Sequence, residues 1–242
     1  MDTHSHLDEL PELERELQEA RECGVVAVVG VGMERESNGK ILQLAREHRN
    51  FVLPAIGLHP WSLPREPERE LEFLREHVEG VVALGEVGMD LKIPKPPELQ
   101  RAVLREVVKI AEEWEKPLLL HARWAWKEVL EEVRGKDLPP SVFHWYSGPE
   151  ELVAEILDQG HYLSVTPALE YSPPHRSALK VCPVERILLE TDSPVKYGGK
   201  EARPKDVVRS LKALSELKGM DGEEVARLTT ENAERVFGVR FT

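Results

Sequence analysis

Short apolar segments alternate with longer amphipathic segments along the chain. The apolar segments are rich in Val, Ile and Leu, and residues 118–120 and 187–189 are apolar at every position. Strands that are buried on both faces have this continuous pattern, as the parallel strands of a barrel do. The pattern predicts eight strands, at residues 1–3, 25–31, 51–56, 81–84, 117–120, 141–143, 162–165 and 186–189.

The amphipathic segments between these strands predict helices, and local signals agree with them. Pro97 stands in a first turn, Asp221 precedes Glu224 with capping-box spacing, and Gly135 and Gly160 follow helical segments as C-terminal caps do. The predicted helices cover residues 9–22, 38–48, 68–77, 97–114, 124–133, 149–158, 175–181, 204–217 and 221–237.

A strand followed by a helix, repeated about eight times, predicts an α/β fold, the (β/α)₈ TIM barrel. The alternative is an open, doubly wound sheet. The length of 242 residues is normal for one such barrel, so we expect residues 1–242 to form a single domain.

The amino-acid composition limits the classes of function that the protein can have. Hydrophobic residues make up 41% and charged residues 31%, and no apolar run is long enough to span a bilayer, so we expect no membrane partner. The net charge of −12 argues against a broad basic surface for nucleic acid, although bound cations can supply positive charge locally. Two distant cysteines, with no signal peptide, indicate a reducing cytoplasm. We expect both thiols to be buried or half-buried, and the protein to be a monomer.

Residues that can carry chemistry follow the predicted strands. In a barrel the carboxyl ends of the strands form the active face, so side chains placed there converge on one point. Any one of these histidines alone is more often structural than a ligand, but together at strand ends they indicate a metal site. The candidate ligands are His4, His6, Glu86, His121, His144 and Asp192, and His59 also follows a predicted strand.

Four histidines and two carboxylates are too many for one tetrahedral ion. His4 and His6 are two apart on an extended chain and share a face, so both can reach one metal. Six ligands suit two divalent ions that share a bridging carboxylate. Imidazole favours Zn or a similar ion, and carboxylates also admit Mg or Mn.

Three tryptophans, Trp124, Trp126 and Trp145, fit either core packing or a substrate-lining position.

The motifs taken together resemble the TatD family of metal-dependent deoxyribonucleases, within the amidohydrolase superfamily. The resemblance covers essentially the whole chain. It departs from the family pattern at Trp124, at Trp145–Tyr146 and at Lys92, which puts the choice of substrate in question. The matching residues are 2–8 (DTHSHLD), 57–60 (GLHP), 85–90 (GEVGMD), 121–123 (HAR), 144–148 (HWYSG) and 190–194 (ETDSP).

The resemblance implies a binuclear site on a TIM barrel. One ion would be held by His4, His6, Glu86 and Asp192, and the second by Glu86, His121 and His144, with Glu86 bridging. It also implies that His59 lines the site near the substrate phosphate.

The leading hypothesis is hydrolysis of a phosphodiester, most simply in DNA, by a water that two metal ions activate. Asp192 would orient that water or accept its proton, and His59 and Arg123 would hold the phosphate. The alternative role for Arg123 is a salt bridge at the barrel rim. Two other hypotheses stay open: hydrolysis of an amide, ester or lactone, and a non-catalytic, metal-dependent binding protein.

Overall fold

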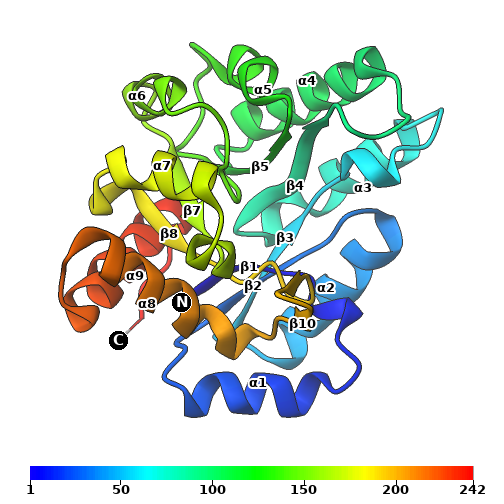
Figure 1. The fold of residues 1–242 in the computed structure, drawn as a ribbon. Coiled ribbons are helices and arrows are strands. Elements are labelled where there is room, and N and C mark those ends of the chain that lie inside the picture. The colour runs from blue at the N-terminus through cyan, green and yellow to red at the C-terminus, as the bar shows by residue number, and fades with distance from the viewer. Residues whose placement is uncertain (242) are drawn as a thin grey trace.

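The computed structural model describes residues 1–241, and its centre is a sheet of eight parallel strands (Figure 1). The strands lie in the sheet in sequence order, so each one pairs with its neighbours along the chain. They are β1 (Asp2–Ser5), β2 (Val28–Val31), β3 (Val52–Ile56), β4 (Ala83–Asp90), β5 (Leu118–Arg123), β6 (Val142–Phe143), β7 (Tyr162–Val165) and β8 (Ile187–Leu189).

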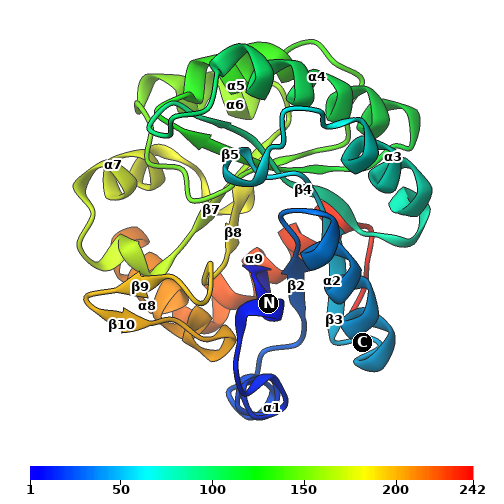
Figure 2. The same cartoon turned by 90° about the vertical axis from the view of Figure 1, so that its right-hand side faces the viewer.

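Helices connect the strands and lie around the outside of the sheet (Figures 1 and 2). Each parallel connection needs such a crossover, because the chain must return to the same end of the sheet before the next strand begins. The helices are α1 (Leu13–Glu22), α2 (Arg35–Glu47), α3 (Glu68–His77), α4 (Pro97–Glu113), α5 (Trp126–Val133), α6 (Glu151–Asp158), α7 (Pro173–Val181), α8 (Val207–Lys218) and α9 (Gly222–Phe237).

Hydrogen bonds between β1 and the residues at and after the end of β8 close the barrel. The Thr3 hydroxyl donates to the Leu189 carbonyl at 3.0 Å, and the His6 amide donates to the Ser193 carbonyl at 2.8 Å. Ser5 and Ser193 form an isolated parallel bridge. The predicted (β/α)₈ barrel is therefore confirmed, and the open doubly wound sheet is not. That residues 1–242 form a single domain stays a prediction.

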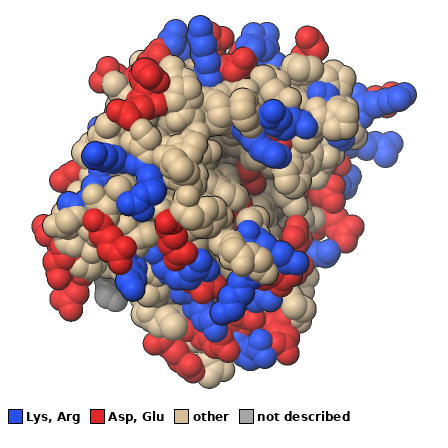
Figure 3. All heavy atoms as spheres, viewed as in Figure 1, with Lys and Arg blue, Asp and Glu red and all other residues tan. Residues whose placement is uncertain are grey.

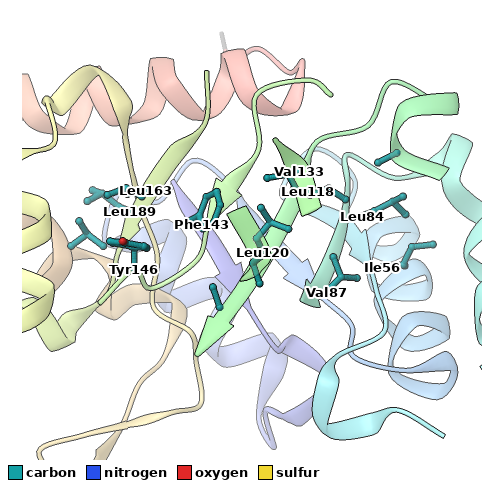
Figure 4. Packing of buried hydrophobic residues seen from close by; sticks show 14 of the residues in the cluster. Ile56, Leu84, Val87, Leu118, Leu120, Val133, Phe143, Tyr146, Leu163 and Leu189 are labelled. Carbon is teal, nitrogen blue, oxygen red and sulfur yellow. The ribbon is translucent and has the colours of Figure 1, made fainter. Parts of the chain in front are cut away.

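The strands bury side chains on both faces, as their apolar pattern predicts. Outward-facing residues such as Leu84, Leu120 and Phe143 pack against the helices (Figure 4). Inward-facing residues form a smaller cluster, which Ala233, Val236 and Phe237 of α9 join. The strand residues of this inner cluster include Val29, Val31, Ala55, Ala83, Leu119, Val142, Tyr162 and Leu188.

This alternation places the polar residues at the mouth of the barrel. Leu119 belongs to the inner cluster, and His121 lies two residues further along the same strand, so it faces the same way. Val142 and His144 have the same relation at the end of β6. The apolar side chains inside the barrel thus pack beneath the histidines, which lie at the carboxyl ends of the strands.

Most predicted elements are confirmed to within a few residues, but β4 is longer than the sequence pattern predicts. The expected strand ends at residue 84, whereas β4 runs from Ala83 to Asp90 and stays paired with β5 as far as Asp90 and Arg123. The polar residues within it hid this extension, because the apolar pattern stops at Leu84. A two-stranded hairpin, β9 (Lys196–Tyr197) and β10 (Lys200–Glu201), was not predicted.

Two expectations about exposure are wrong. His175 follows two prolines at the start of the predicted helix 175–181, a position that predicts exposure, but it is fully buried in α7. Its Nδ1 donates to the Tyr146 carbonyl at 2.7 Å, so the ring acts as a polar cross-link. Cys23 is expected to be at least half-buried but is exposed, while Cys182 is buried. Among the helices of residues 1–241, none has the length and apolar character needed to cross a membrane.

Candidate metal centre

The carboxyl ends of the strands bring the predicted ligands together in one place. Figure 3 shows the surface hollowed near the middle of this face, with acidic atoms inside the hollow. All but one of the seven predicted site residues at the strand ends are buried, and His121 is half-buried. A set of buried imidazoles and carboxylates is costly to desolvate unless its members are paired or bind metal.

One group of ligand atoms forms around β1. His4 Nε2 and His6 Nε2 lie 3.3 and 3.5 Å from Glu86 Oε2. Asp192 Oδ1 lies 3.4 Å from His6 Nε2 and 3.8 Å from His4 Nε2. Neighbouring ligand atoms of a tetrahedral ion with bonds of about 2.1 Å are about 3.4 Å apart. The spacing therefore matches a shared cation.

A second group forms on the other oxygen of Glu86. Glu86 Oε1 lies 2.5 Å from His121 Nδ1 and 3.3 Å from His59 Nε2. His144 Nε2 lies farther away, 3.8 Å from Glu86 Oε1 and 3.7 Å from Asp192 Oδ2. The two oxygens of Glu86 thus face two different sets of histidines, which is the arrangement of a bridging carboxylate.

The histidines have the unsatisfied atoms that a metal would occupy. Within residues 1–241, neither ring nitrogen of His4 has a hydrogen-bond partner, although both are buried. An unpaired buried polar atom costs roughly 1–3 kcal/mol, so such atoms need an explanation. The donor set of imidazoles and carboxylates suits Zn and similar divalent ions, and these residues therefore fit a metal site.

One hydrogen bond and two nearby carboxylates outside the ligand set flank three of the imidazoles. His6 Nδ1 donates to the Val31 carbonyl at 2.9 Å, which leaves the Nε2 lone pair facing Glu86 and Asp192. His144 Nδ1 lies 2.9 Å from Glu190 Oε1, and His121 Nε2 lies 3.6 Å from Asp90 Oδ2. Metal-binding histidines are commonly fixed in this way by a carboxylate or carbonyl.

In His59 the two ring nitrogens have the opposite roles: Nδ1 accepts a hydrogen bond instead of donating one. Its Nδ1 accepts a hydrogen bond from the Trp61 amide at 3.2 Å, so the neutral ring carries its proton on Nε2. Its Nε2 faces His121 Nδ1 at 3.2 Å. A protonated ring nitrogen donates hydrogen bonds but cannot bind a cation. This tautomer favours His59 as a hydrogen-bond donor beside the ligands rather than as a ligand.

Glu190 and Asp90 are site residues that the sequence reasoning missed. Asp90 lies four residues after Glu86 on an extended strand, so both face the same way. Glu190 is two residues before Asp192 and also accepts a hydrogen bond from the Trp145 amide at 3.0 Å. In each case the signal was a second carboxylate at even spacing from a predicted ligand.

The two predicted carboxylate ligands are anionic at neutral pH. Burial by itself disfavours their charge, but the surrounding imidazoles outweigh it and hold the pKa of Glu86 well below its usual range. The pKa of Asp192 is lowered in the same way, against its burial, by His144, His6 and His4. Both carboxylates are therefore present in the charged form that a cation binds.

Strained backbone also marks the barrel mouth. Trp124, Trp145 and Asp192 have φ angles of 55°, 40° and 50°, a left-handed conformation that non-glycine residues seldom adopt. Strain of this kind costs about 1–3 kcal/mol per residue and collects at functional sites. Trp124 comes directly after β5 and Trp145 directly after His144, while Asp192 is itself a predicted ligand.

Arg123 stands at the rim of the hollow. Its Nη1 lies 3.4 Å from Asp90 Oδ2, so the salt bridge considered from the sequence is present, although long. The side chain is still half exposed, with 52% of its surface accessible. The guanidinium therefore keeps donors free for a ligand at the mouth.

Comparison with known proteins agrees with this geometry. The family model "TatD related DNase" matches residues 1–238. A metal-dependent hydrolase of Bacillus subtilis, YabD, is 31% identical over 98% of both chains, and the human deoxyribonuclease TATDN3 is 29% identical over 98% of this chain and 94% of its own. The crystal structure of YjjV, a TatD homologue from Escherichia coli, superimposes with a TM-score of 0.92 at 30% identity, covering 99% of this chain and 98% of the other. The metal-dependent hydrolase fold and the resemblance found in the sequence are confirmed, and the chain belongs to the TatD related DNase family.

Proposed function

We propose that this chain is a deoxyribonuclease that hydrolyses phosphodiester bonds of DNA with two divalent cations. The position of Glu86 carries the proposal, because one of its oxygens faces His4 and His6 and the other faces His121. A carboxylate shared in this way holds two ions side by side, an arrangement that suits displacement at a phosphodiester. The deoxyribonuclease activity that names the human relative supports DNA as the substrate.

The contacts suggest how the ligands divide between the ions. His4, His6, Glu86 and Asp192 would hold one ion, and Glu86, His121 and His144 the second. When bound, the cations make hydroxide available at neutral pH and neutralise charge on the phosphoryl oxygens. Imidazole favours Zn, and the carboxylates also admit Mg or Mn.

The chain's own side chains supply the remaining chemistry. The carboxylate oxygens of Asp192 lie among the ligand atoms, 3.4 Å from His6 Nε2 and 3.7 Å from His144 Nε2, so Asp192 can orient the attacking water or accept its proton. The Nε2 proton of His59 can be donated to a phosphoryl oxygen, because Trp61 fixes that tautomer. Arg123 can hold a second phosphoryl oxygen with its planar fork of donors.

Metal removal and replacement test the proposal. Metal analysis of the purified protein should find two divalent ions per chain, and the loaded protein should cleave single- or double-stranded DNA. A chelator should abolish cleavage, and Zn, Mg or Mn added afterwards should restore it. Undiminished cleavage after the metal has been removed would contradict the proposal. Metal-dependent turnover of an amide, ester or lactone, with no cleavage of DNA, would replace it by the alternative activity.

A further inference from the structure

Two tryptophans at the barrel mouth are exposed although their size favours burial. Of the five tryptophans in the chain, Trp61 and Trp124 are the most exposed, at 54% and 57%. Core packing was one expectation for Trp124, and it is wrong. Trp61 follows β3 and Trp124 follows β5, so the two side chains stand on either side of the end of β4.

Trp61 is held in a fixed orientation beside the metal centre. Its indole Nε1 donates to Asp90 Oδ2 at 2.7 Å, and its ring lies edge-on to His59 with centroids 5.1 Å apart. Asp90 itself is fully buried and also faces His121. The polar edge of the indole is thus satisfied, and its orientation is set before any ligand arrives. Such preorganisation lowers the entropy lost on binding.

Trp124 carries a cation on its ring. Lys92 Nζ lies 3.9 Å from the centroid of Trp124, and the Leu91 amide donates to the Arg123 carbonyl at 3.0 Å, which ties the two loops together. The left-handed backbone at Trp124 costs free energy, and its ring stays 57% exposed although Lys92 and Trp126 lie beside it. A strained and exposed aromatic residue three positions after a metal-site histidine is better explained by a ligand than by packing.

The charges beside these rings select the kind of ligand. Lys92 and the half-exposed Arg123 place two cations at the mouth of a chain whose net charge is −12. Rings with cations next to them fit a strand of unpaired nucleotides, because bases stack on the indoles while phosphates meet the cations. The bases of a duplex stack on one another and offer no such faces.

We propose that Trp61 and Trp124, with Lys92 and Arg123, form a stacking subsite that holds unpaired bases next to the phosphodiester being cut. The inference rests on the proposed function, since it assigns a substrate contact of that same centre.

Steady-state kinetics on two substrates tests the subsite. One is a short single-stranded oligothymidylate, and the other is bis(p-nitrophenyl) phosphate, which has no base. Removing one stacked base contact costs about fivefold to 100-fold in affinity. We expect Trp124→Leu to lower the ratio of kcat/KM for the oligonucleotide to kcat/KM for the small diester by that factor, mainly through KM. Trp124→Phe should keep most of the ratio, because the aromatic face remains.

Trp114 provides the matched control. It is 40% exposed but caps the C-terminus of α4, away from the strand ends that carry the site. Trp114→Leu should therefore leave the ratio at its wild-type value. A ratio unchanged in Trp124→Leu, or lowered equally by the Phe and Leu substitutions, would overturn the stacking subsite.

A binding measurement separates the subsite from the activity. Stacking on a base quenches indole fluorescence, so oligothymidylate should quench the wild-type protein and quench Trp124→Leu less. If the metal-loaded wild type hydrolyses neither substrate yet shows this difference, the proposed activity fails and the subsite stands. Equal quenching of the wild type and Trp124→Leu would refute the subsite whatever the activity.

Discussion

The Asp192→Asn substitution separates a catalytic role from a metal-binding role. The amide keeps the shape of the side chain and one oxygen that can bind metal, but it removes the negative charge and the proton acceptor. Asp192 is buried, so solvent water cannot compensate for the loss of its negative charge. Its oxygens lie 3.4 Å from His6 Nε2 and 3.7 Å from His144 Nε2, so the loss falls on the centre itself.

We expect turnover to fall by about 10²-fold or more, the usual effect of losing a general acid or base. At about 1.4 kcal/mol per factor of ten, this corresponds to about 2.7 kcal/mol or more in the activation barrier. At least one ion should remain, because His4 and His6 keep their distances of 3.3 and 3.5 Å to Glu86. Substrate affinity should change little, because His59 and Arg123 are untouched.

The assay is single-turnover and steady-state cleavage of a single-stranded oligonucleotide at saturating metal, with the metal content measured on the same sample. Inactive, metal-loaded protein supports the role of Asp192 as proton acceptor. Near-normal turnover with full metal content would refute that role and leave Asp192 a dispensable ligand. If turnover and metal are lost together, Asp192 is assigned to metal binding.

Three further substitutions test the bridging carboxylate, the role of His59 and the pH dependence of stability. Glu86→Gln should lower metal affinity more than loss of any single histidine, because both ions share its charge; metal titration giving wild-type affinity would contradict the bridging role. His59→Ala should raise KM for DNA while the protein still binds as many ions as the wild type, and loss of one ion would make His59 a ligand instead. Burial, and next Arg186, lower the pKa of His161 to about 4, against about 6.5 when unfolded, so the unfolded chain takes up a proton first as the pH falls. Stability should therefore drop between pH 6.5 and 4, by up to about 3 kcal/mol from this residue, and urea unfolding of His161→Asn should show a smaller drop over the same range.

The fold was predictable because its signal is repeated. Eight apolar segments, each followed by a helical one, support one another, so an error at one boundary does not change the architecture. The convergence of the candidate ligands was predictable for a related reason, because His121 and His144 follow apolar segments whose inward-facing residues determine where the next polar side chain points. In both cases the periodicity of a strand carries the information.

What the sequence did not predict depends on contacts between distant segments. The extension of β4 to Asp90 is fixed by pairing with β5, which local apolar periodicity does not report. Burial of His175 depends on the Tyr146 carbonyl, 29 positions earlier in the chain. The tautomer of His59 is an exception, because a local contact sets it: the ring accepts a hydrogen bond from the Trp61 amide, two residues later in the turn after β3.

The charge of the chain constrains how it can engage DNA. Proteins that bind DNA through a broad basic face gain affinity by neutralising many phosphates, and a net charge of −12 makes that route unfavourable here. The remaining route is local. In the proposed complex the cations and Arg123 would meet the phosphate to be cut, Lys92 would meet a neighbouring phosphate, and stacking on Trp61 and Trp124 would add affinity that does not depend on net charge. The stacking and cation contacts that overcome the electrostatic repulsion would also make the protein specific for unpaired bases. A duplex would bring more phosphates into the site and would offer no free base faces.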